Sequence, residues 1–244
     1  MYGETSVTTE SLSPFSATVR TDRGTDTSYM ARYHLLRIVR DGSIVFIALF
    51  AIISLVPIPV GTSEPASGRA PISLLATQML TFLVAILGLN WSYYERDNLW
   101  IVVAAAKSPA PYFRGLMMSF MTVGLVVALA FVAFYLGTYA GPLPVSEVAV
   151  PIAAAVSAAL ASTACLTRLK VQPAAFSFAM LAILLAAVVA GYVGGFAASA
   201  LLIAAQLALG LPPAMQAVLL AAYCGGLAAF GLWWVSRLAA GFRL

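Results

Sequence analysis

Few side chains in this sequence could do chemistry, and their spacing does not form a catalytic site. Glu95 and Asp97 lie two residues apart, so on a helix they would point in different directions. The single histidine, His34, has no neighbouring ligand or nucleophile, and we expect it on a solvated or interfacial face. Cys165 and Cys224 lie in apolar stretches, where cysteine behaves as a small buried hydrophobe. We therefore predict no catalytic residue, no metal and no cofactor, and a protein that is not an enzyme.

The two lysines also argue against nucleotide hydrolysis by this chain. A P-loop requires the pattern Gly-x-x-x-x-Gly-Lys-Ser/Thr, in which backbone amides and the lysine hold the phosphates. Lys107 follows Ala106 and Lys170 follows Leu169, so neither lysine stands in such a loop. If the protein moves a solute, we expect the energy to come from a gradient or from another chain.

The composition indicates an all-α polytopic membrane protein. Of the 244 residues, 62% are hydrophobic and 9% are charged, whereas a soluble domain carries about 25% charged residues. The net charge of +4 could suggest nucleic acid, but the charges stand at the ends of apolar segments. Charges in that position set the topology of membrane proteins. We therefore expect a membrane-lipid environment and no nucleic-acid partner.

The N-terminal part divides into a polar tail and a short helix. Residues 1–28 are rich in Ser and Thr and are predicted to be a disordered cytoplasmic tail. Residues 29–41 are predicted to be helical, with apolar residues towards one side and basic residues towards the other. The apolar side would hold Ala31, Leu35, Ile38 and Val39, and the basic side His34, Arg37 and Arg40. Two interpretations stay open: an amphipathic helix on the membrane surface, or a basic anchor before the first span.

Charge-free segments of about 20 residues predict the membrane spans. We predict one transmembrane domain over residues 29–244 with six transmembrane helices, and residues 29–41 as its N-terminal interfacial helix. A re-entrant or outer element is expected between the fifth and sixth helices, because Gly191–Phe196 and Gly210–Pro213 interrupt that apolar stretch. The six predicted spans cover residues 43–60, 72–91, 115–137, 148–167, 174–193 and 213–235.

The distribution of basic residues predicts the orientation. With six spans, all the Lys and Arg residues except Arg69 fall on the side of the two termini. By the positive-inside rule, both termini are predicted to be cytoplasmic in a multi-pass protein of the cytoplasmic (plasma) membrane. The six apolar cores contain no Asp, Glu, Lys, Arg or His, which disfavours a proton-coupled transporter but leaves a sodium site of backbone carbonyls open.

The cytoplasmic loop after the second predicted span contains a short helical segment. Leu99–Ala106 is apolar and eight residues long, too short to cross a bilayer. Acidic residues precede it, Lys107 follows it, and Ser108-Pro109 ends it, as expected for a helix capped by charges. Two readings are open: an interfacial helix anchored by Trp100, or a docking helix for a soluble partner. The rim of a docking helix would hold Glu95, Arg96 and Asp97.

The stretch YYERDNLWIVVAAAKSPAPYFRG, which ends at Gly115, resembles the corresponding loop of type-2 ATP-binding-cassette exporter permeases. In that family an acidic and a basic residue follow the second span, then a short coupling helix, a Ser-Pro break and a glycine. Here Glu95-Arg96 match the start, Asn98–Ala106 the helix, Ser108-Pro109 the break, and Arg114-Gly115 the return. This chain differs in having Lys107 before the break and no lysine after Gly115.

The resemblance implies a non-catalytic permease subunit that works with a second permease copy, identical or not, and with cytosolic P-loop ATPase subunits. The ATPase would drive efflux of an amphiphilic or small-molecule substrate. The residues expected to dock and couple the ATPase are Glu95, Arg96, Asp97, Asn98, Leu99, Trp100, Lys107 and Arg114. Two other functions stay open: a non-transporting assembly or binding subunit of a larger membrane complex, and a gradient-driven secondary transporter.

Overall fold

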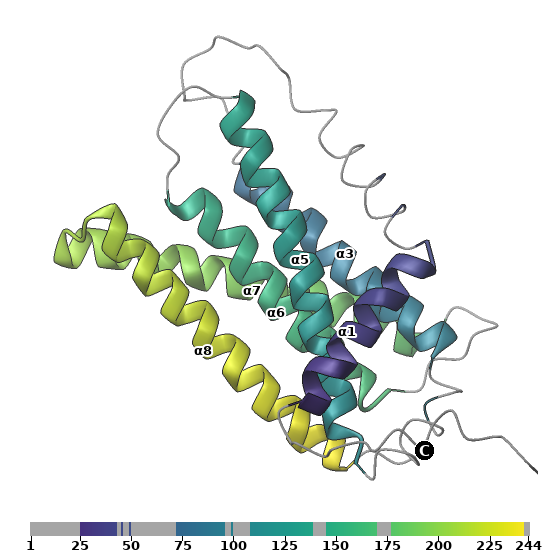
Figure 1. Ribbon diagram of the computed structural model, residues 1–244. Coiled ribbons are helices and arrows are strands. Elements are labelled where there is room, and N and C mark those ends of the chain that lie inside the picture. Colours follow the sequence, from purple (N-terminus) through teal and green to yellow (C-terminus); the bar gives the residue numbers. More distant parts are fainter. Residues whose placement is uncertain are drawn as a thin grey trace, which may run out of the picture.

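The computed structural model describes residues 25–42, 45, 49, 72–95, 99, 108–138, 145–169 and 177–241. The regular elements of these ranges are helices and pack side by side (Figure 1). In chain order they are α1 (Thr25–Arg40), α3 (Ile72–Tyr94), α5 (Ala110–Thr138), α6 (Val145–Leu166), α7 (Phe178–Leu209) and α8 (Pro213–Ala240). The predicted interfacial helix corresponds to α1, which begins at Thr25, inside the predicted tail.

Four of the helices are long and apolar enough to cross a membrane, so the chain has the architecture of a helical membrane protein. These stretches are Ala110–Phe134, Glu147–Leu166, Phe178–Leu209 and Pro213–Ala240. The predicted span 72–91 lies within helix α3. The predicted span 43–60 falls outside the described residues, apart from Val45 and Leu49, so the count of six spans stays a prediction.

Helices α3, α6 and α7 pack closely because glycines on one helix meet hydroxyl side chains on another. The hydroxyl of Ser157 donates a hydrogen bond to the carbonyl of Ala153 at 2.8 Å, and the hydroxyl of Thr81 donates one to the carbonyl of Gln78 at 2.9 Å; each bond lies within its own helix. Their side chains then occupy space that a glycine leaves on the neighbouring helix. The three contacts pair Gly88 with Ser162, Gly191 with Thr81, and Gly194 with Ser157. Small residues at such contacts are a general means of bringing membrane helices together.

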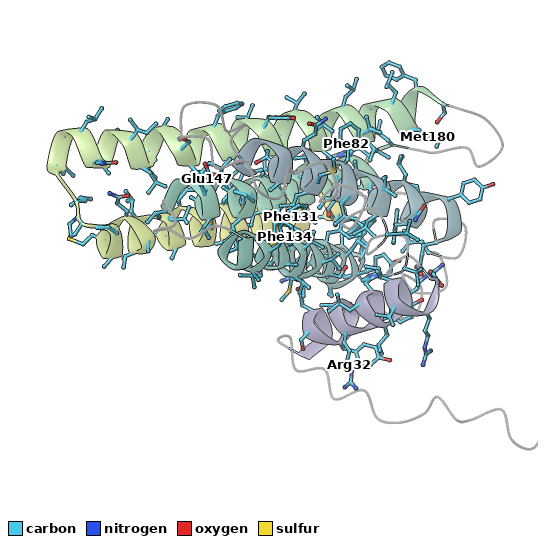
Figure 2. The ribbon with its side chains drawn as sticks, turned by 90° about the horizontal axis from the view of Figure 1, so that it is seen from above. Arg32, Phe82, Phe131, Phe134, Glu147 and Met180 are labelled. Carbon is cyan, nitrogen blue, oxygen red and sulfur yellow. The ribbon has the colours of Figure 1, made fainter. Side chains whose placement is uncertain are left out.

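The predicted re-entrant element between residues 193 and 213 is not present, because α7 runs without interruption from Phe178 to Leu209. The glycines read as a break are packing positions, and the chain turns only at Gly210, which adopts φ 58°. With 32 residues α7 is about 48 Å long, against about 30 Å of hydrocarbon. Figure 2 shows α7 and α8 extending together past the other helices.

Substitution by alanine should have opposite effects at a glycine that contacts a neighbouring helix and at a glycine with open space around it. A Cβ on Gly194 would lie 2.6 Å from Ser157 Cβ, whereas a Cβ on Gly225 of α8 would meet no described atom within 4 Å. Alanine gains about 1 kcal/mol over glycine in a helix, but overpacking costs about 1–3 kcal/mol. We expect Gly194→Ala to lower the melting temperature in detergent and the matched Gly225→Ala to leave it unchanged or raise it. Equal shifts in the two variants would contradict the packing role of Gly194.

Candidate functional site: the Glu95 cluster

The end of α3, the start of α5 and the inner side of α1 meet at one end of the bundle. The backbone amide of Glu95 donates to Trp91 O at 2.9 Å, which extends the last turn of α3. At the start of α5, Ser108 Oγ accepts a hydrogen bond of 3.3 Å from the amide of Ala110, as a capping side chain does. Pro109 and Pro111 stand at this helix start, where a missing N–H costs little.

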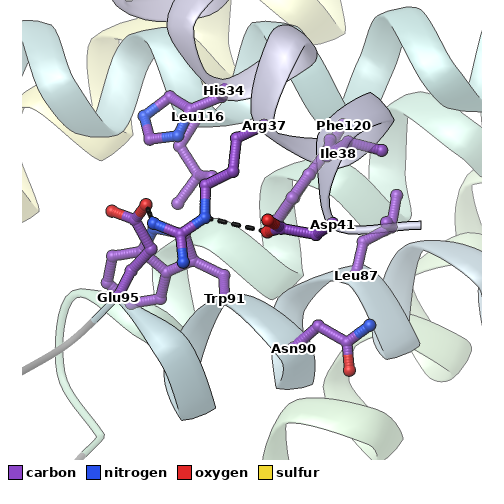
Figure 3. A pocket seen from close by; sticks show the side chains of 10 residues that line it. All are labelled: His34, Arg37, Ile38, Asp41, Leu87, Asn90, Trp91, Glu95, Leu116 and Phe120. Carbon is purple, nitrogen blue, oxygen red and sulfur yellow. Dashed lines mark hydrogen bonds and ion pairs between the residues drawn. The ribbon is translucent and has the colours of Figure 1, made fainter. Parts of the chain in front are cut away.

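Glu95 is the centre of this meeting point. Its side chain is only 3% exposed. One carboxylate oxygen accepts a hydrogen bond from Tyr112 Oη at 2.5 Å, and the other accepts one from Tyr33 Oη at 3.3 Å. The second oxygen also forms an ion pair with Arg37, which Figure 3 shows. A buried carboxylate is tolerated only when its oxygens are paired in this way. We call Tyr33, Arg37, Glu95 and Tyr112 the Glu95 cluster.

Neighbouring side chains hold the cluster in position. Trp91 Nε1 donates to Tyr112 Oη at 2.9 Å, so Tyr112 both accepts from the indole and donates to the carboxylate. Such chains of hydrogen bonds polarise and strengthen one another. On the other side, Arg37 Nε donates to Asp41 Oδ2 at 2.9 Å. The guanidinium of Arg37 therefore bridges a buried carboxylate and an exposed one.

His34 is buried beside the cluster, so its expected place on a solvated face was wrong. It is 2% exposed and makes edge-to-face contacts with Tyr33 and Tyr112, at ring-centroid distances of 5.3 and 4.6 Å. Burial, with a smaller contribution from the charge of Arg37, lowers the pKa of His34 from 6.5 to about 3, although a hydrogen bond with the backbone of Tyr112 acts in the opposite direction. The imidazole is therefore neutral at physiological pH and packs as an aromatic ring.

Helix α1 lies directly on α5 at Gly115. A Cβ at this position would be 2.7 Å from the backbone nitrogen of Ala31, too close for any side chain. A cavity of about 40 Å³ remains between α1, α3 and α5, which is room for little more than water. Its polar wall contains Arg37, Asp41, Asn90 and Glu95, and its apolar wall contains Leu116 and Phe120.

The structure places the residues predicted to dock a partner as follows. Glu95 faces inward instead of standing at the rim of a docking helix, because its carboxylate is enclosed by α1 and α5. Leu99, expected to face a partner, is fully buried in the apolar cluster that includes Trp91 and Phe113. Arg114 is half-buried, and its Nε has no hydrogen-bond partner among the described residues. The remaining positions, Arg96, Asp97, Asn98, Trp100 and Lys107, lie outside the described residues.

Sequence reasoning did not find Tyr33, Arg37, Trp91 and Tyr112. The sequence did indicate that Tyr33 and Arg37 lie next to each other, because they are four residues apart and share one side of a helix. Nothing in the sequence, however, indicated which cation would pair with Glu95, because Arg37 lies 58 positions earlier in the chain. Within the described ranges no three His, Cys, Asp or Glu side chains could hold a metal ion together. The arrangement joins three helices through one carboxylate.

Removal of the carboxylate should release α1. In Glu95→Ala, the guanidinium of Arg37 and the phenols of Tyr33 and Tyr112 lose their shared acceptor, and breaking a buried pair costs about 3 kcal/mol. We expect a lower melting temperature in detergent and faster proteolysis next to α1. The control Asp41→Ala removes only the exposed partner of Arg37, which is worth less than about 1 kcal/mol. A Glu95→Ala effect no larger than that of Asp41→Ala would contradict the central position of Glu95.

Acid should destabilise the protein through His34. The unfolded histidine binds a proton below pH 6.5, whereas the folded one does so only near pH 3. The contribution of His34 to the free energy of unfolding is therefore fully present above pH 6.5. It is lost as the pH falls towards 3, at about 1.4 kcal/mol per pH unit. From pH 7 to pH 5 we expect a loss of about 2 kcal/mol in thermal unfolding that is absent in His34→Phe. The same loss in both proteins would assign the effect to other groups.

No family model, no curated protein and no solved structure matches the chain.

Proposed function

We propose that the chain is the membrane-spanning permease subunit of an ATP-driven exporter of the ATP-binding-cassette type. In this proposal a separate cytosolic P-loop ATPase hydrolyses the nucleotide, and a second permease copy completes the path. The chain has six spans and both termini in the cytoplasm of a cell whose cytoplasmic membrane holds the complex. The exported substrate is an amphiphile or a small molecule.

The observation that carries the proposal is that both ends of the loop between α3 and α5 are fixed at one point. Glu95, at the beginning of the loop, accepts a hydrogen bond from Tyr112, just after its end, and pairs with Arg37 of α1. A partner that pushed on residues 96–107 would therefore move α1, α3 and α5 together. Rigid transmission of this kind is what a coupling loop between an ATPase and a permease requires.

The charges at this end of the bundle support a cytoplasmic position for the loop. Arg168 follows the end of α6 and lies next to Gly241, at the end of α8. One turn earlier, the guanidinium of Arg237 stacks over Trp233 at 5.7 Å from the ring centroid, as expected at a membrane–water interface. The opposite turn, Gly210–Pro213, contains no charged side chain.

The interior of the bundle supports an amphiphilic substrate rather than a highly charged one. Among the described residues, Glu95 is the one buried side chain that carries a formal charge, and it lies at the cytoplasmic end in this orientation. The buried polar groups deeper in the bundle are hydroxyls: Thr77, Thr81, Ser119, Ser157, Ser162 and Thr163. Hydroxyls can accept a polar headgroup without the cost of a buried charge.

Copurification tests the proposal. The tagged chain is purified from its native host in mild detergent, and we expect a stoichiometric P-loop ATPase with it. Arg96→Glu and Lys107→Glu should abolish that association, because each replaces a positive charge of the loop by a negative one, while Arg168→Glu, an exposed residue outside the loop, should retain it. Glu95 is unsuitable for this test, because its replacement disturbs α1.

Recovery of the wild-type chain with membrane proteins and without an ATPase would contradict the proposal and favour an assembly subunit. Transport that an uncoupler abolishes while cellular ATP is unchanged would contradict it in favour of a gradient-driven transporter. Retention of the ATPase by both loop variants would leave the exporter function standing and remove the loop as its docking site.

A further inference from the structure

Helix α1 has a second face whose side chains are exposed. At about 100° per residue, the exposed side chains from Tyr29 onwards fall within an arc of about 120°. We call this arc the outer face of α1; it consists of Tyr29, Arg32, Tyr33, Leu36, Val39 and Arg40. The exposed fractions of its aromatic and aliphatic members run from 39% at Tyr33 to 67% at Tyr29. Figure 2 shows Arg32 pointing away from the bundle.

The chemistry of the outer face combines cations with apolar and aromatic groups. Among the described residues neither Arg32 nor Arg40 forms an ion pair, whereas Arg37, on the inner side, pairs with both Asp41 and Glu95. The outer face contains no carboxylate. Tyrosine and arginine beside leucine and valine are the composition of helices that lie at the boundary between headgroups and acyl chains.

The position of α1 along the bundle agrees with that boundary. It contacts α5 at Gly115, five residues after Ala110, where α5 begins. Five residues of helix rise about 8 Å, so α1 lies within a headgroup layer's depth of the end of a membrane-spanning helix. The inner side of α1 is held by the contacts of Arg37 with Glu95 and of His34 with Tyr112, which leaves the outer face towards the surroundings of the bundle.

We propose that the outer face of α1 is a binding surface for anionic phospholipids. Arg32 and Arg40 bind the headgroup phosphates, and the side chains of Tyr29, Leu36 and Val39 insert at the level of the upper acyl chains. This binding goes beyond the exporter proposal, because it needs neither an ATPase nor transport. The basic charge favours a negatively charged leaflet over a neutral one by about fivefold for each arginine near the surface.

Lipid binding to the outer face of α1 would also affect the Glu95 cluster. Tyr33 belongs to both, since its ring is partly exposed on the outer face while its hydroxyl donates to Glu95. A headgroup that draws the phenol of Tyr33 towards the surface would remove one of the three partners of the buried carboxylate. The anionic lipid content of the leaflet is thereby linked to how firmly α1 is held.

A depth-sensitive label on the full chain tests this surface. Bimane is attached at Leu36→Cys in a background of Cys165→Ala and Cys224→Ala, and the protein is placed in nanodiscs of phosphatidylcholine and phosphatidylglycerol. In one preparation the phosphatidylglycerol is brominated in its acyl chains, in the other the phosphatidylcholine. We expect the brominated anionic lipid to quench the label more than its share of the bilayer predicts. Arg32→Gln with Arg40→Gln should lower that enrichment by about fivefold or more.

Matched variants separate charge from folding. Arg168→Gln removes an exposed arginine at the same end of the bundle and should leave the enrichment unchanged. Arg32→Lys with Arg40→Lys keeps the charge and should retain most of it. Equal quenching by the two lipids in the wild-type background would overturn the anionic preference. Absence of quenching by either lipid would overturn the membrane position of the outer face and assign it to a soluble partner. Both outcomes leave the copurification test unaffected.

Discussion

Burial of the Glu95 carboxylate is the constraint on which the end of the bundle near α1 depends. A carboxylate at 3% exposure must keep its charge compensated and its oxygens hydrogen-bonded, and no single helix supplies enough partners. Arg37 and Tyr33 come from α1, and Tyr112 comes from α5. The position of α1, the closure of the loop after α3 and the burial of His34 all follow from satisfying one acidic group.

Two different kinds of interaction hold the two parts of the bundle together. In the apolar middle, glycines of α3 and α7 accept the side chains of Ser162, Thr81 and Ser157, and the contact is one of shape. At the end near α1, directed hydrogen bonds and an ion pair take over. Packing of small side chains thus joins the helices in the middle of the bundle, whereas charge and hydrogen bonding join them at the end near α1.

Much of the fold could be predicted from the sequence, because long apolar segments bounded by charges and prolines indicate membrane helices. The start of α8 at Pro213 was predicted, α5 covers the segment expected at 115–137, and α6 covers the segment expected at 148–167 up to Leu166. The path of α7 was not, since a Gly-x-x-Gly-Gly run reads the same whether it breaks a helix or packs against Ser157. The direction of Glu95 also could not be predicted, because its pairing with Arg37 depends on tertiary structure. His34 was misplaced because a helical wheel treats histidine as polar, whereas here it packs as a ring.

The uninterrupted length of α7 has a consequence for the bilayer around the protein. A helix of about 48 Å fits within about 30 Å of hydrocarbon only at a tilt of about 50°, beyond the range of about 0–40° seen for transmembrane helices. The turn into α8 exposes mainly large apolar side chains, among them Leu207, Leu209, Met215 and Val218. This hydrophobic mismatch is relieved where the acyl chains are longer, so the α7–α8 hairpin favours a thick bilayer and thickens a thin one locally.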